Sequence, residues 1–148
     1  MSEVLSNAQS LVESKVTTSG VKIQLEVPSD APKIWCDSSS LEQVFVNLIS
    51  NAIDAMKNST NKKIKISVGS FGEHILISVR DTGPGIKKEN LEDIFRPFFT
   101  TKAAGEGTGL GLSICKQIID KHHGEISVES DLGVGTVFTI KLRTRPLA

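Results

Sequence analysis

The chain has 148 residues, 39% of them hydrophobic and 23% charged, which is typical of one globular domain with one core. Its 17 Lys and Arg residues balance 17 Asp and Glu residues, so the net charge gives no electrostatic argument for nucleic acid or an anionic membrane as a partner. Because the chain has neither a long apolar run nor a signal peptide, we expect a cytoplasmic domain without membrane contacts of its own; membrane anchoring of the full-length protein stays open.

The first part of the chain is predicted to form a helix, a strand and a longer helix. Apolar residues at helical spacing indicate a helix over about 4–12, and alternation indicates a strand over 21–27. The clearest pattern runs over 41–56, where apolar residues recur at i, i+3 and i+4. Ser39 with Glu42 fits a capping box at the start of this helix.

Two alternating strands follow, over 64–68 and 75–79, and the short link at 70–73 predicts that they form a hairpin. The next stretch, 81–107, is rich in glycine and contains prolines. It is long for a loop in a small domain, and such loops are more often binding segments than simple connections. One short helix is expected within it, over 88–94.

The last part of the chain is predicted to contain a helix over 109–121 and two strands, over 125–129 and 136–142, joined by a Gly-rich turn. The buried face of this helix is expected to comprise Gly111, Ile114, Cys115, Ile118 and His122. The element order favours an α/β (α+β) two-layer sandwich, in which helices cover one face of a mixed sheet.

Three polar residues lie beside the apolar stripe of the 41–56 helix: Asn47, Asn51 and Asp54. They are either solvated helix residues or the polar wall of a pocket. Asn is a poor residue for the middle of a helix, so two of them one turn apart favour the pocket. An amide oxygen there could ligate a hard cation such as Mg²⁺.

The segment Asp81–Gly85 follows directly after a predicted strand. It is either an ordinary surface turn or a ligand site in which a carboxylate stands beside glycines that let a flat ligand approach. An ionised Asp only accepts hydrogen bonds, so Asp81 could select an exocyclic amine, such as that of adenine, over a keto group.

The segment Gly107–Leu112 precedes or opens a predicted helix. Backbone N–H groups at a Gly-rich helix start can cradle phosphate, and the alternative is a flexible hinge. A P-loop is excluded because no Gly-Lys-Ser/Thr occurs here. A dinucleotide fingerprint is not matched either, since Leu112 stands where a glycine is required and no strand immediately precedes the segment.

The segment Phe95–Lys102 places three phenylalanines within five residues of a predicted loop. These rings need burial, either as a small satellite cluster or as an aromatic latch that responds to a ligand. Thr100, Thr101 and Lys102 would then lie near phosphate, with Lys102 as a point charge on a γ-phosphate.

Taken together, these blocks resemble the catalytic, ATP-binding domain of sensor histidine kinases, part of a superfamily that includes DNA gyrase, heat-shock chaperone and mismatch-repair ATPases. The resemblance covers about residues 3–143, and we expect residues 1–148 to form a single domain of this type. It implies a mixed, mainly antiparallel sheet of about five strands, with three main helices on one face and a long ATP lid. The motifs that carry it are Asn47–Ala55, Asp81–Gly85, Phe95–Phe99, Gly107–Leu112 and Gly133–Thr136.

The resemblance also implies ligand roles, with ATP and Mg²⁺ as the cofactors. Asp81 would bind the adenine amino group with support from Thr136, Asn51 would ligate Mg²⁺, and the ATP lid would run from about Arg96 to Gly107. Further nucleotide contacts would come from Asp54, Gly83, Gly85, Ile86, Thr100, Thr101, Lys102, Gly107, Thr108, Gly109, Leu110, Gly111 and Leu112.

Asn47 and Lys102 are the positions that the resemblance assigns to catalysis. In the ATPase branches, the residue four before the magnesium Asn is a Glu that activates water; here it is Asn47, which cannot act as a carboxylate base. The resemblance therefore implies transfer of the γ-phosphate to a histidine, and the alternatives are an ATPase or a Ser-kinase (anti-sigma-type) module of the same fold.

No phosphoacceptor motif precedes residue 47, so we expect the dimerisation and phosphoacceptor domain to lie outside this chain. The resemblance implies three further features of the full-length protein: a homodimeric state, a response regulator receiver domain as its other partner, and no nucleic-acid partner.

Overall fold

The computed structural model describes residues 1–102 and 107–145. Its five strands form one sheet in the order β1-β2-β3-β5-β4, in which only β1 and β2 run parallel. The strands are β1 (Lys22–Glu26), β2 (Lys63–Phe71), β3 (His74–Asp81), β4 (Glu125–Asp131) and β5 (Gly135–Arg143). The helices are α1 (Ser2–Leu11), α2 (Glu13–Ser19), α3 (Ser38–Ala55) and α4 (Gly111–Lys121), with a 3₁₀ turn, η1, at Lys88–Asn90.

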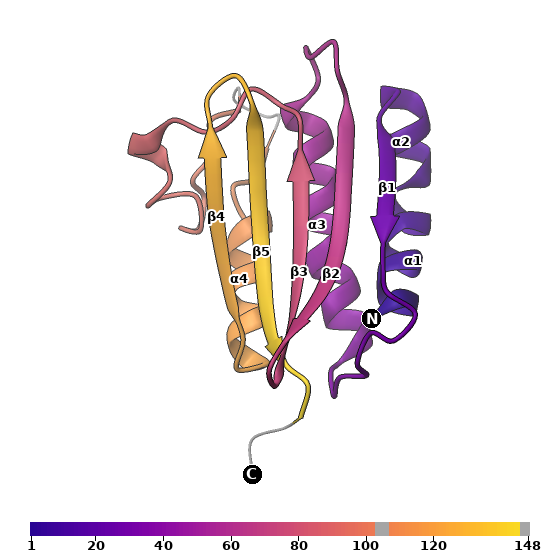
Figure 1. Ribbon diagram of the computed structural model, residues 1–148. Coiled ribbons are helices and arrows are strands. Elements are labelled where there is room, and N and C mark those ends of the chain that lie inside the picture. The colour runs from indigo at the N-terminus through magenta and orange to yellow at the C-terminus, as the bar shows by residue number, and fades with distance from the viewer. Residues whose placement is uncertain (103–106, 146–148) are drawn as a thin grey trace.

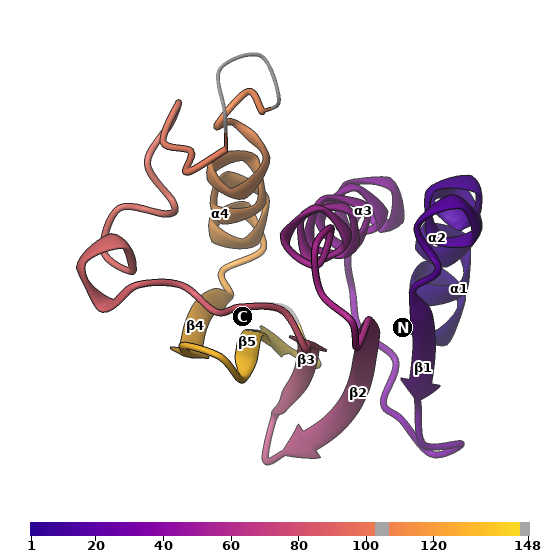
Figure 2. The ribbon, with the colours of Figure 1, turned by 90° about the horizontal axis from the view of Figure 1, so that it is seen from above.

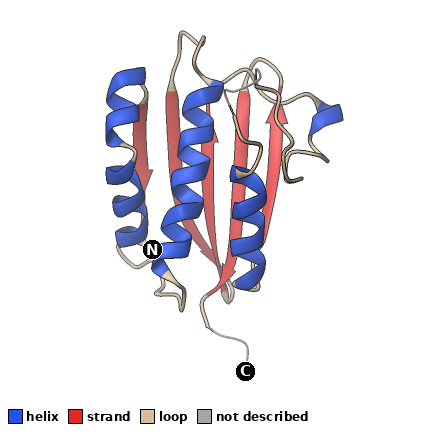
Figure 3. Cartoon of the chain, turned by 180° about the vertical axis from the view of Figure 1, so that it is seen from behind, coloured by secondary structure: helices blue, strands red, loops and turns tan. Residues whose placement is uncertain are grey.

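All four α-helices of the described residues lie on one face of the sheet (Figure 1, Figure 3). Seen from above, α1 and α2 stack as one bent column beside α3, and α4 forms the third column over β4 and β5 (Figure 2). The expected two-layer sandwich with a mixed, mainly antiparallel five-stranded sheet is confirmed. In the part of the chain that the structure describes, no helix is both long and apolar enough to cross a membrane.

The core lies between α3 and the inner face of the sheet, as the periodicity of α3 predicts. The α3 side chains Leu41, Phe45 and Ile49 have no exposed surface. Alternate residues of the strands meet them because successive side chains of a strand point to opposite faces. The buried apolar residues of the strands are Ile64, Ile66, Val68, Ile75, Ile77, Val79, Ile126, Phe138, Ile140 and Leu142.

The predicted capping box at the start of α3 is wrong. The helix begins at Ser38 with Asp37 as its N-cap, two residues before the expected cap, and the Ser40 hydroxyl donates to the Asp37 carboxylate. Glu42 instead accepts a hydrogen bond from Asn7 Nδ2 at 2.9 Å, so a contact with α1 replaces the local one.

The helix expected over 109–121 begins two residues later, and its predicted buried face is only partly right. Gly109 has φ of +70° and so cannot belong to a right-handed helix. With this start, Ser113, Cys115 and Ile119 are the buried residues, whereas Ile114 is 38% exposed. Cys115 packs on α3, with its Sγ 3.6 Å from the carbonyl oxygen of Val44.

His122, at the C-cap of α4, connects this helix to the start of α3. The His122 Nε2 accepts a hydrogen bond from the Asp37 backbone N–H at 3.1 Å, and its Nδ1 lies 2.8 Å from the Ile118 carbonyl oxygen. Nδ1 therefore carries the ring proton in this arrangement, because Nε2 acts as the acceptor. The contact fixes the far end of α4 against α3.

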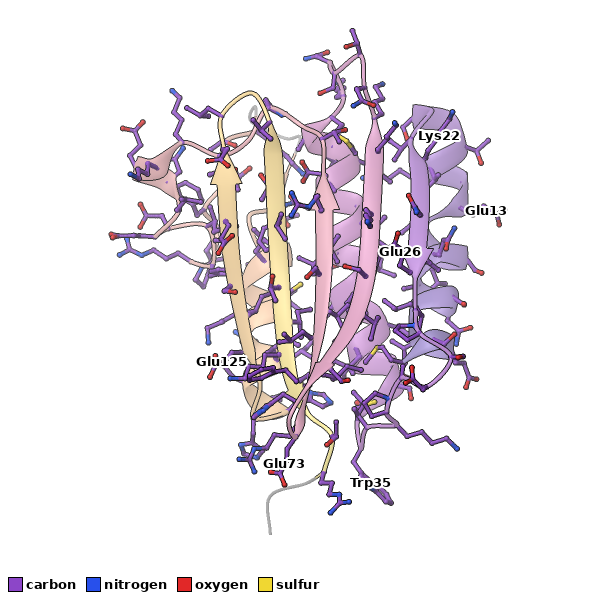
Figure 4. All side chains as sticks on the ribbon, viewed as in Figure 1. Glu13, Lys22, Glu26, Trp35, Glu73 and Glu125 are labelled. Carbon is purple, nitrogen blue, oxygen red and sulfur yellow. The ribbon has the colours of Figure 1, made fainter. Side chains whose placement is uncertain are left out.

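Two other expectations change in detail, and one large side chain is unexpectedly placed on the surface. The first helix breaks at Val12, which leaves Leu11 69% exposed and starts the unpredicted α2. The helix expected over 88–94 shrinks to η1 followed by turns. In the loop between β1 and α3, Trp35 is 81% exposed and projects from the molecule (Figure 4).

Candidate functional site

A cavity of about 450 Å³ lies between α3, the start of α4 and the loop that joins β3 to α4. Its volume is in the range of small-molecule sites. In Figure 2 this loop curves away from the sheet on the α4 side. The lining residues are Asn47, Ser50, Asn51, Asp54, Ala55, Asp81, Pro84, Gly85, Ile86, Ile94, Phe99, Thr100, Thr101, Lys102, Gly107, Thr108, Gly109, Gly111, Leu112, Thr136 and Phe138.

The structure brings nearly all of the predicted site residues to this one cavity. Of the residues expected to bind nucleotide or act in catalysis, only Gly83 and Leu110 are absent from its lining. Residues from α3, the end of β3, the start of α4 and the start of β5 therefore meet, although they are spread over some 90 positions of sequence. Of the expected lid, residues 103–106 lie outside the described residues.

Six lining residues were not predicted as site residues: Ser50, Ala55, Pro84, Ile94, Phe99 and Phe138. Ser50 and Ala55 lie within the α3 motif and Pro84 within the Asp81–Gly85 segment, so their motifs already pointed to the site. Phe138 was recognisable only as an inward-facing strand residue. Its ring meets that of Phe95 edge to face, with centroids 6.2 Å apart.

Asp81 is the buried acid of the site. It ends β3 with 6% of its surface exposed, and its Oδ1 accepts the Gly83 backbone N–H at 2.9 Å. Burial raises the pKa of Asp81 above its ordinary value, and hydrogen bonds from the backbone of Gly83 and Thr136 oppose this only in part. A carboxylate kept buried at such an energetic cost is often functional.

Glycines provide the space around this carboxylate. A Cβ at Gly83 would lie 3.1 Å from Asp81 Oδ1 and 3.3 Å from Met56 Cγ, so any larger residue would crowd the acid. Gly135 has φ of +148°, and a Cβ there would collide with the Asp81 carbonyl oxygen. The close approach of β5 to the end of β3 thus requires glycine at position 135.

Ser130 connects Thr136 to the loop that follows Asp81. The Ser130 Oγ lies 2.8 Å from Thr136 Oγ1 and accepts the Ile86 backbone N–H at 2.7 Å. Thr136 is itself buried, with 4% exposed. Ser130 was not predicted, and no local sequence signal marks it, because its partners come from β5 and from a loop more than 40 residues away.

Asn47 joins α3 to the start of α4. Its Nδ2 donates to the Gly111 carbonyl oxygen at 3.2 Å, and its Oδ1 accepts from Gln43 Nε2 at 2.8 Å. Both ends of this amide are therefore engaged with protein groups. Asn51, one turn further along α3, lines the cavity.

The N-terminus of α4 opens onto the cavity. Among the described residues no side chain caps this end of the helix, and Gly111 and Leu112 of its first turn line the cavity. The preceding N–H of Leu110 is bonded to Thr108 Oγ1 at 3.3 Å. An uncapped helix start presents N–H groups with partial positive charge, which is an anion-binding arrangement.

Two lysines share the carboxylate of Asp54. Lys15 Nζ lies 2.7 Å from Asp54 Oδ1, and Lys102 Nζ lies 2.6 Å from Asp54 Oδ2. Burial would raise the pKa of Asp54, but hydrogen bonds from Lys102 and Lys15 and their charges bring the pKa below its ordinary value. Asp54 is therefore ionised at neutral pH, and Lys102 is held at the cavity wall by an ion pair.

The expectation that three phenylalanines need burial is wrong for one of them. Phe95 packs on Phe138 and Phe99 lines the cavity, but Phe98 is 75% exposed and has φ of +65°. Its backbone lies so close to Gly109 that a Cβ at Gly109 would collide with it. At Phe98 the segment is therefore held by the contact of its backbone with Gly109, although burial of the Phe98 ring was expected.

Among the described residues, no group of three or more His, Cys, Asp and Glu side chains could hold a metal ion. The lining residues with side-chain oxygens are instead the amides Asn47 and Asn51, the acids Asp54 and Asp81, and the hydroxyl residues Ser50, Thr100, Thr101, Thr108 and Thr136. This donor set suits a hard cation that brings most of its ligands with it.

Comparison with known proteins gives one consistent result. Residues 36–146 match the family model described as histidine kinase-, DNA gyrase B-, and HSP90-like ATPase. Sporulation kinase E of Bacillus subtilis (strain 168) is 39% identical over 146 residues, which are 98% of this chain but only 19% of that protein. The chain thus spans about a fifth of that curated relative.

Solved structures agree. The catalytic domain of histidine kinase ThkA superposes with a TM-score of 0.86 at 37% identity, over 99% of this chain and 93% of that one. A structure of histidine kinase ThkA in complex with the response regulator protein TrrA superposes with a TM-score of 0.80 at 33% identity, over 97% of this chain and 40% of that one.

Proposed function

The chain belongs to the family of histidine kinase-, DNA gyrase B- and HSP90-like ATPases, and we propose that its cavity binds ATP with Mg²⁺. The observation that carries the proposal is the convergence of a buried carboxylate, an amide-bearing helix and an uncapped helix N-terminus on one cavity. Each of these groups matches a different part of a magnesium-bound nucleotide. The remaining question is what each one does.

Asp81 is proposed to select the base. Its ionised carboxylate only accepts hydrogen bonds, so it favours the exocyclic amine of adenine over the keto group of guanine or hypoxanthine. Gly83 leaves the carboxylate open to a flat ring, and Ile94, Phe99 and Phe138 give the cavity apolar surface. Thr136, held by Ser130, supports the same end of the cavity.

The start of α4 and Lys102 are proposed to hold the phosphates. The N–H groups of the first turn of α4 offer donors to phosphate oxygens, and Lys102 Nζ supplies a full positive charge from the opposite loop. Thr100, Thr101 and Thr108 line the cavity nearby and can donate hydroxyl hydrogen bonds. The segment 96–107 is the proposed ATP lid.

Asn51 is proposed to ligate Mg²⁺ through its amide oxygen, with phosphate oxygens as other ligands. When bound, the ion supplies charge neutralisation for phosphoryl transfer. Asn47, one turn earlier on α3, offers no carboxylate base to activate water. Its amide instead positions the start of α4.

We therefore propose that residues 1–148 form the cytoplasmic catalytic domain of a sensor histidine kinase. This domain presents the γ-phosphate of ATP to a histidine of a separate dimerisation and phosphoacceptor domain. The names of the relatives support this assignment, as does the ThkA complex with its response regulator. On this proposal the full-length protein is a homodimer and passes the phosphate to a receiver domain.

The test of ATP binding is calorimetry on the wild-type chain and on Asp81→Asn, with MgATP and MgITP as ligands. A hydrogen bond to a charged group is worth about 1.5–3 kcal/mol, so Asp81→Asn should weaken ATP binding about 10- to 150-fold. Because the amide can donate, the preference for ATP over ITP should also fall. Asp30→Asn, an exposed acid in the β1–α3 loop, is the matched control. Wild-type material that is folded but takes up no MgATP would end the proposal.

The kinase assignment is tested with labelled ATP and a supplied phosphoacceptor domain. Acid-labile phosphohistidine should appear on that domain, and Asp81→Asn should reduce its formation. Rapid release of inorganic phosphate by the chain alone would instead favour an ATPase of the same family.

A further inference from the structure

Asp54 lies at the meeting point of two segments that are far apart in sequence. Lys15 reaches it from α2 and Lys102 from the loop before α4, and each lysine takes one oxygen of the carboxylate. Lys15 also donates to Ser50 Oγ at 2.7 Å, so it contacts two residues on successive turns of α3. Both Ser50 and Asp54 line the cavity. Lys15 itself lies outside the region 36–146 that matches the family model.

Lys15 lies on the side of α2 that faces α3. Glu13, two residues earlier on α2, points away from the molecule (Figure 4), whereas Lys15 turns toward α3. The three side chains of the cluster are each 30–40% exposed, so their ion pairs are partly screened by water and can exchange partners. The cluster carries one surplus positive charge at the cavity wall.

Lys102 has two possible anionic partners once a triphosphate is bound: Asp54 and the phosphate oxygens. If Lys102 moves to the phosphate, Asp54 keeps Lys15 as its counter-ion, and no bare carboxylate is left near the ligand. Without Lys15, the same movement would leave an unpaired negative charge beside the phosphates, which disfavours binding. The Lys15–Asp54 ion pair therefore affects the net charge at the phosphate end of the site.

We infer that Lys15 is a positioning residue of the nucleotide site, which neutralises Asp54 and so releases Lys102 to the phosphates of ATP. The inference rests on the proposed function. It adds α1–α2, the N-terminal helical column, to the elements that set ATP affinity, and it makes Asp54 the shared partner through which Lys15 acts. Lys15 itself does not touch the ligand on this reading.

The experiment measures MgATP and adenosine affinities by calorimetry for the wild type, Lys15→Met and Lys15→Arg, each alone and combined with Asp54→Asn. Lys15→Met should weaken ATP binding about 3- to 10-fold and leave adenosine binding unchanged, because only the phosphates meet Lys102. Lys15→Arg should restore ATP affinity. In the Asp54→Asn background, Lys15→Met should change ATP affinity by less than about twofold, because the acid that it neutralises is gone.

Lys62→Met is the matched control. Lys62 Nζ also binds α2, at the Ser19 carbonyl oxygen (3.2 Å), but it lies away from the cavity lining. The Lys62→Met substitution removes one positive charge and one contact to α2, as Lys15→Met does, and it should leave ATP affinity unchanged.

Three results would overturn the inference while leaving the proposed function intact: wild-type ATP affinity in Lys15→Met, an equal loss of ATP and adenosine affinity, or an undiminished loss in the Asp54→Asn background. The second of these would indicate a merely structural role, and the third a charge effect that bypasses Asp54. Failure of the wild type to bind MgATP would instead overturn the proposed function itself.

Discussion

The cavity has two walls that are built differently. One, which we call the fixed wall, consists of α3 with the adjoining ends of β3 and β5, and its key groups Asp81 and Thr136 are almost fully buried. The other, the loop wall, consists of 99–102 and 107–109. Its contacts include the hydrogen bond of the Lys102 N–H to Thr100 Oγ1, the approach of Gly109 to the Phe98 backbone and the Lys102–Asp54 ion pair.

The difference teaches how one small domain can separate recognition from response. Groups on regular elements are set by the same hydrogen bonds and core packing that stabilise the fold, so the fixed wall is formed before a ligand arrives. Groups on the loop wall are held by partly exposed contacts, so a ligand can change their partners at little cost. In our proposal the base lies on the first wall, and the phosphates lie between the start of α4 and the second wall.

The largest effect is expected from Gly135→Ala on the fixed wall. At φ of +148° a side chain is strained, and the new Cβ would collide with the Asp81 carbonyl oxygen between two paired strands. Strain and overpacking together should lower the free energy of unfolding by about 3–5 kcal/mol, measured by urea denaturation. Gly69→Ala in β2, where a Cβ meets nothing within 4 Å, is the control and should change stability by less than about 1 kcal/mol. A small effect of Gly135→Ala would mean that this wall yields as readily as the other.

A smaller and more local effect is expected from Gly109→Ala on the loop wall. The left-handed conformation costs an alanine about 1–2 kcal/mol, and the collision with the Phe98 backbone forces the loop to shift. ATP affinity should fall about 5- to 30-fold by calorimetry, whereas the free energy of global unfolding should fall by no more than about 2 kcal/mol, less than for Gly135→Ala.

Gly133→Ala separates the conformational cost of a left-handed alanine from the collision with a neighbouring backbone. Gly133 has φ of +78° in the β4–β5 turn, but a Cβ there meets nothing within 4 Å. It should show the conformational cost without the loss of ATP affinity. If Gly109→Ala destabilised the whole fold as strongly as Gly135→Ala, the two walls would have to be treated as one cooperative unit.

The smallest effect is expected from pH, through Asp81. Burial raises its pKa, so as pH falls toward and through that raised pKa the carboxylate gains a proton and loses its ability to accept from adenine. Adenosine affinity should then fall by at most about tenfold per pH unit, and Asp81→Asn should show no such dependence. Adenosine is the ligand of choice because it has no phosphate groups that titrate. A flat pH profile for the wild type would separate Asp81 from base recognition.

The same pKa shift predicts the stability of the variant. A folded-state pKa above the unfolded value means that the protonated acid favours folding, and that this contribution is lost as pH rises through the folded pKa. At neutral pH the ionised, buried Asp81 is therefore a net cost to folding, and Asp81→Asn should be at least as stable as the wild type. A loss of nucleotide affinity in this variant then reports on the site, because the fold is preserved.

Sequence reasoning was most successful where a local pattern has a single physical meaning. The apolar period of α3 and the alternation of β2, β3 and β5 predicted the layers, and Asp81 stood out because an acid followed a strand directly. The segments that carry the predicted site residues then meet at one cavity because the sheet order brings β5 next to β3 and α4 next to α3.

Sequence reasoning failed where the partner lies far away. Lys15 and Ser130 carry no local signal, since their roles depend on contacts with α3 and with the loop after β3. The capping box at Ser39 was outcompeted by Asp37 and by a contact between Glu42 and α1. Phe98 is exposed because the backbone, not its ring, packs against Gly109.

The link between His122 and Asp37 has a mechanical consequence for α4. The His122–Asp37 hydrogen bond fixes the C-terminal end of the helix, and Cys115 packs on α3 in between. The other end faces the cavity, where the Asn47 amide bonds it to α3. Eleven residues span about 16 Å, so a tilt of about 4° around the anchored end displaces the tip by about 1 Å. That is enough to make or break a hydrogen bond. A very small rotation of α4 about its anchored end can therefore change which hydrogen bonds the N-terminus of the helix makes at the cavity.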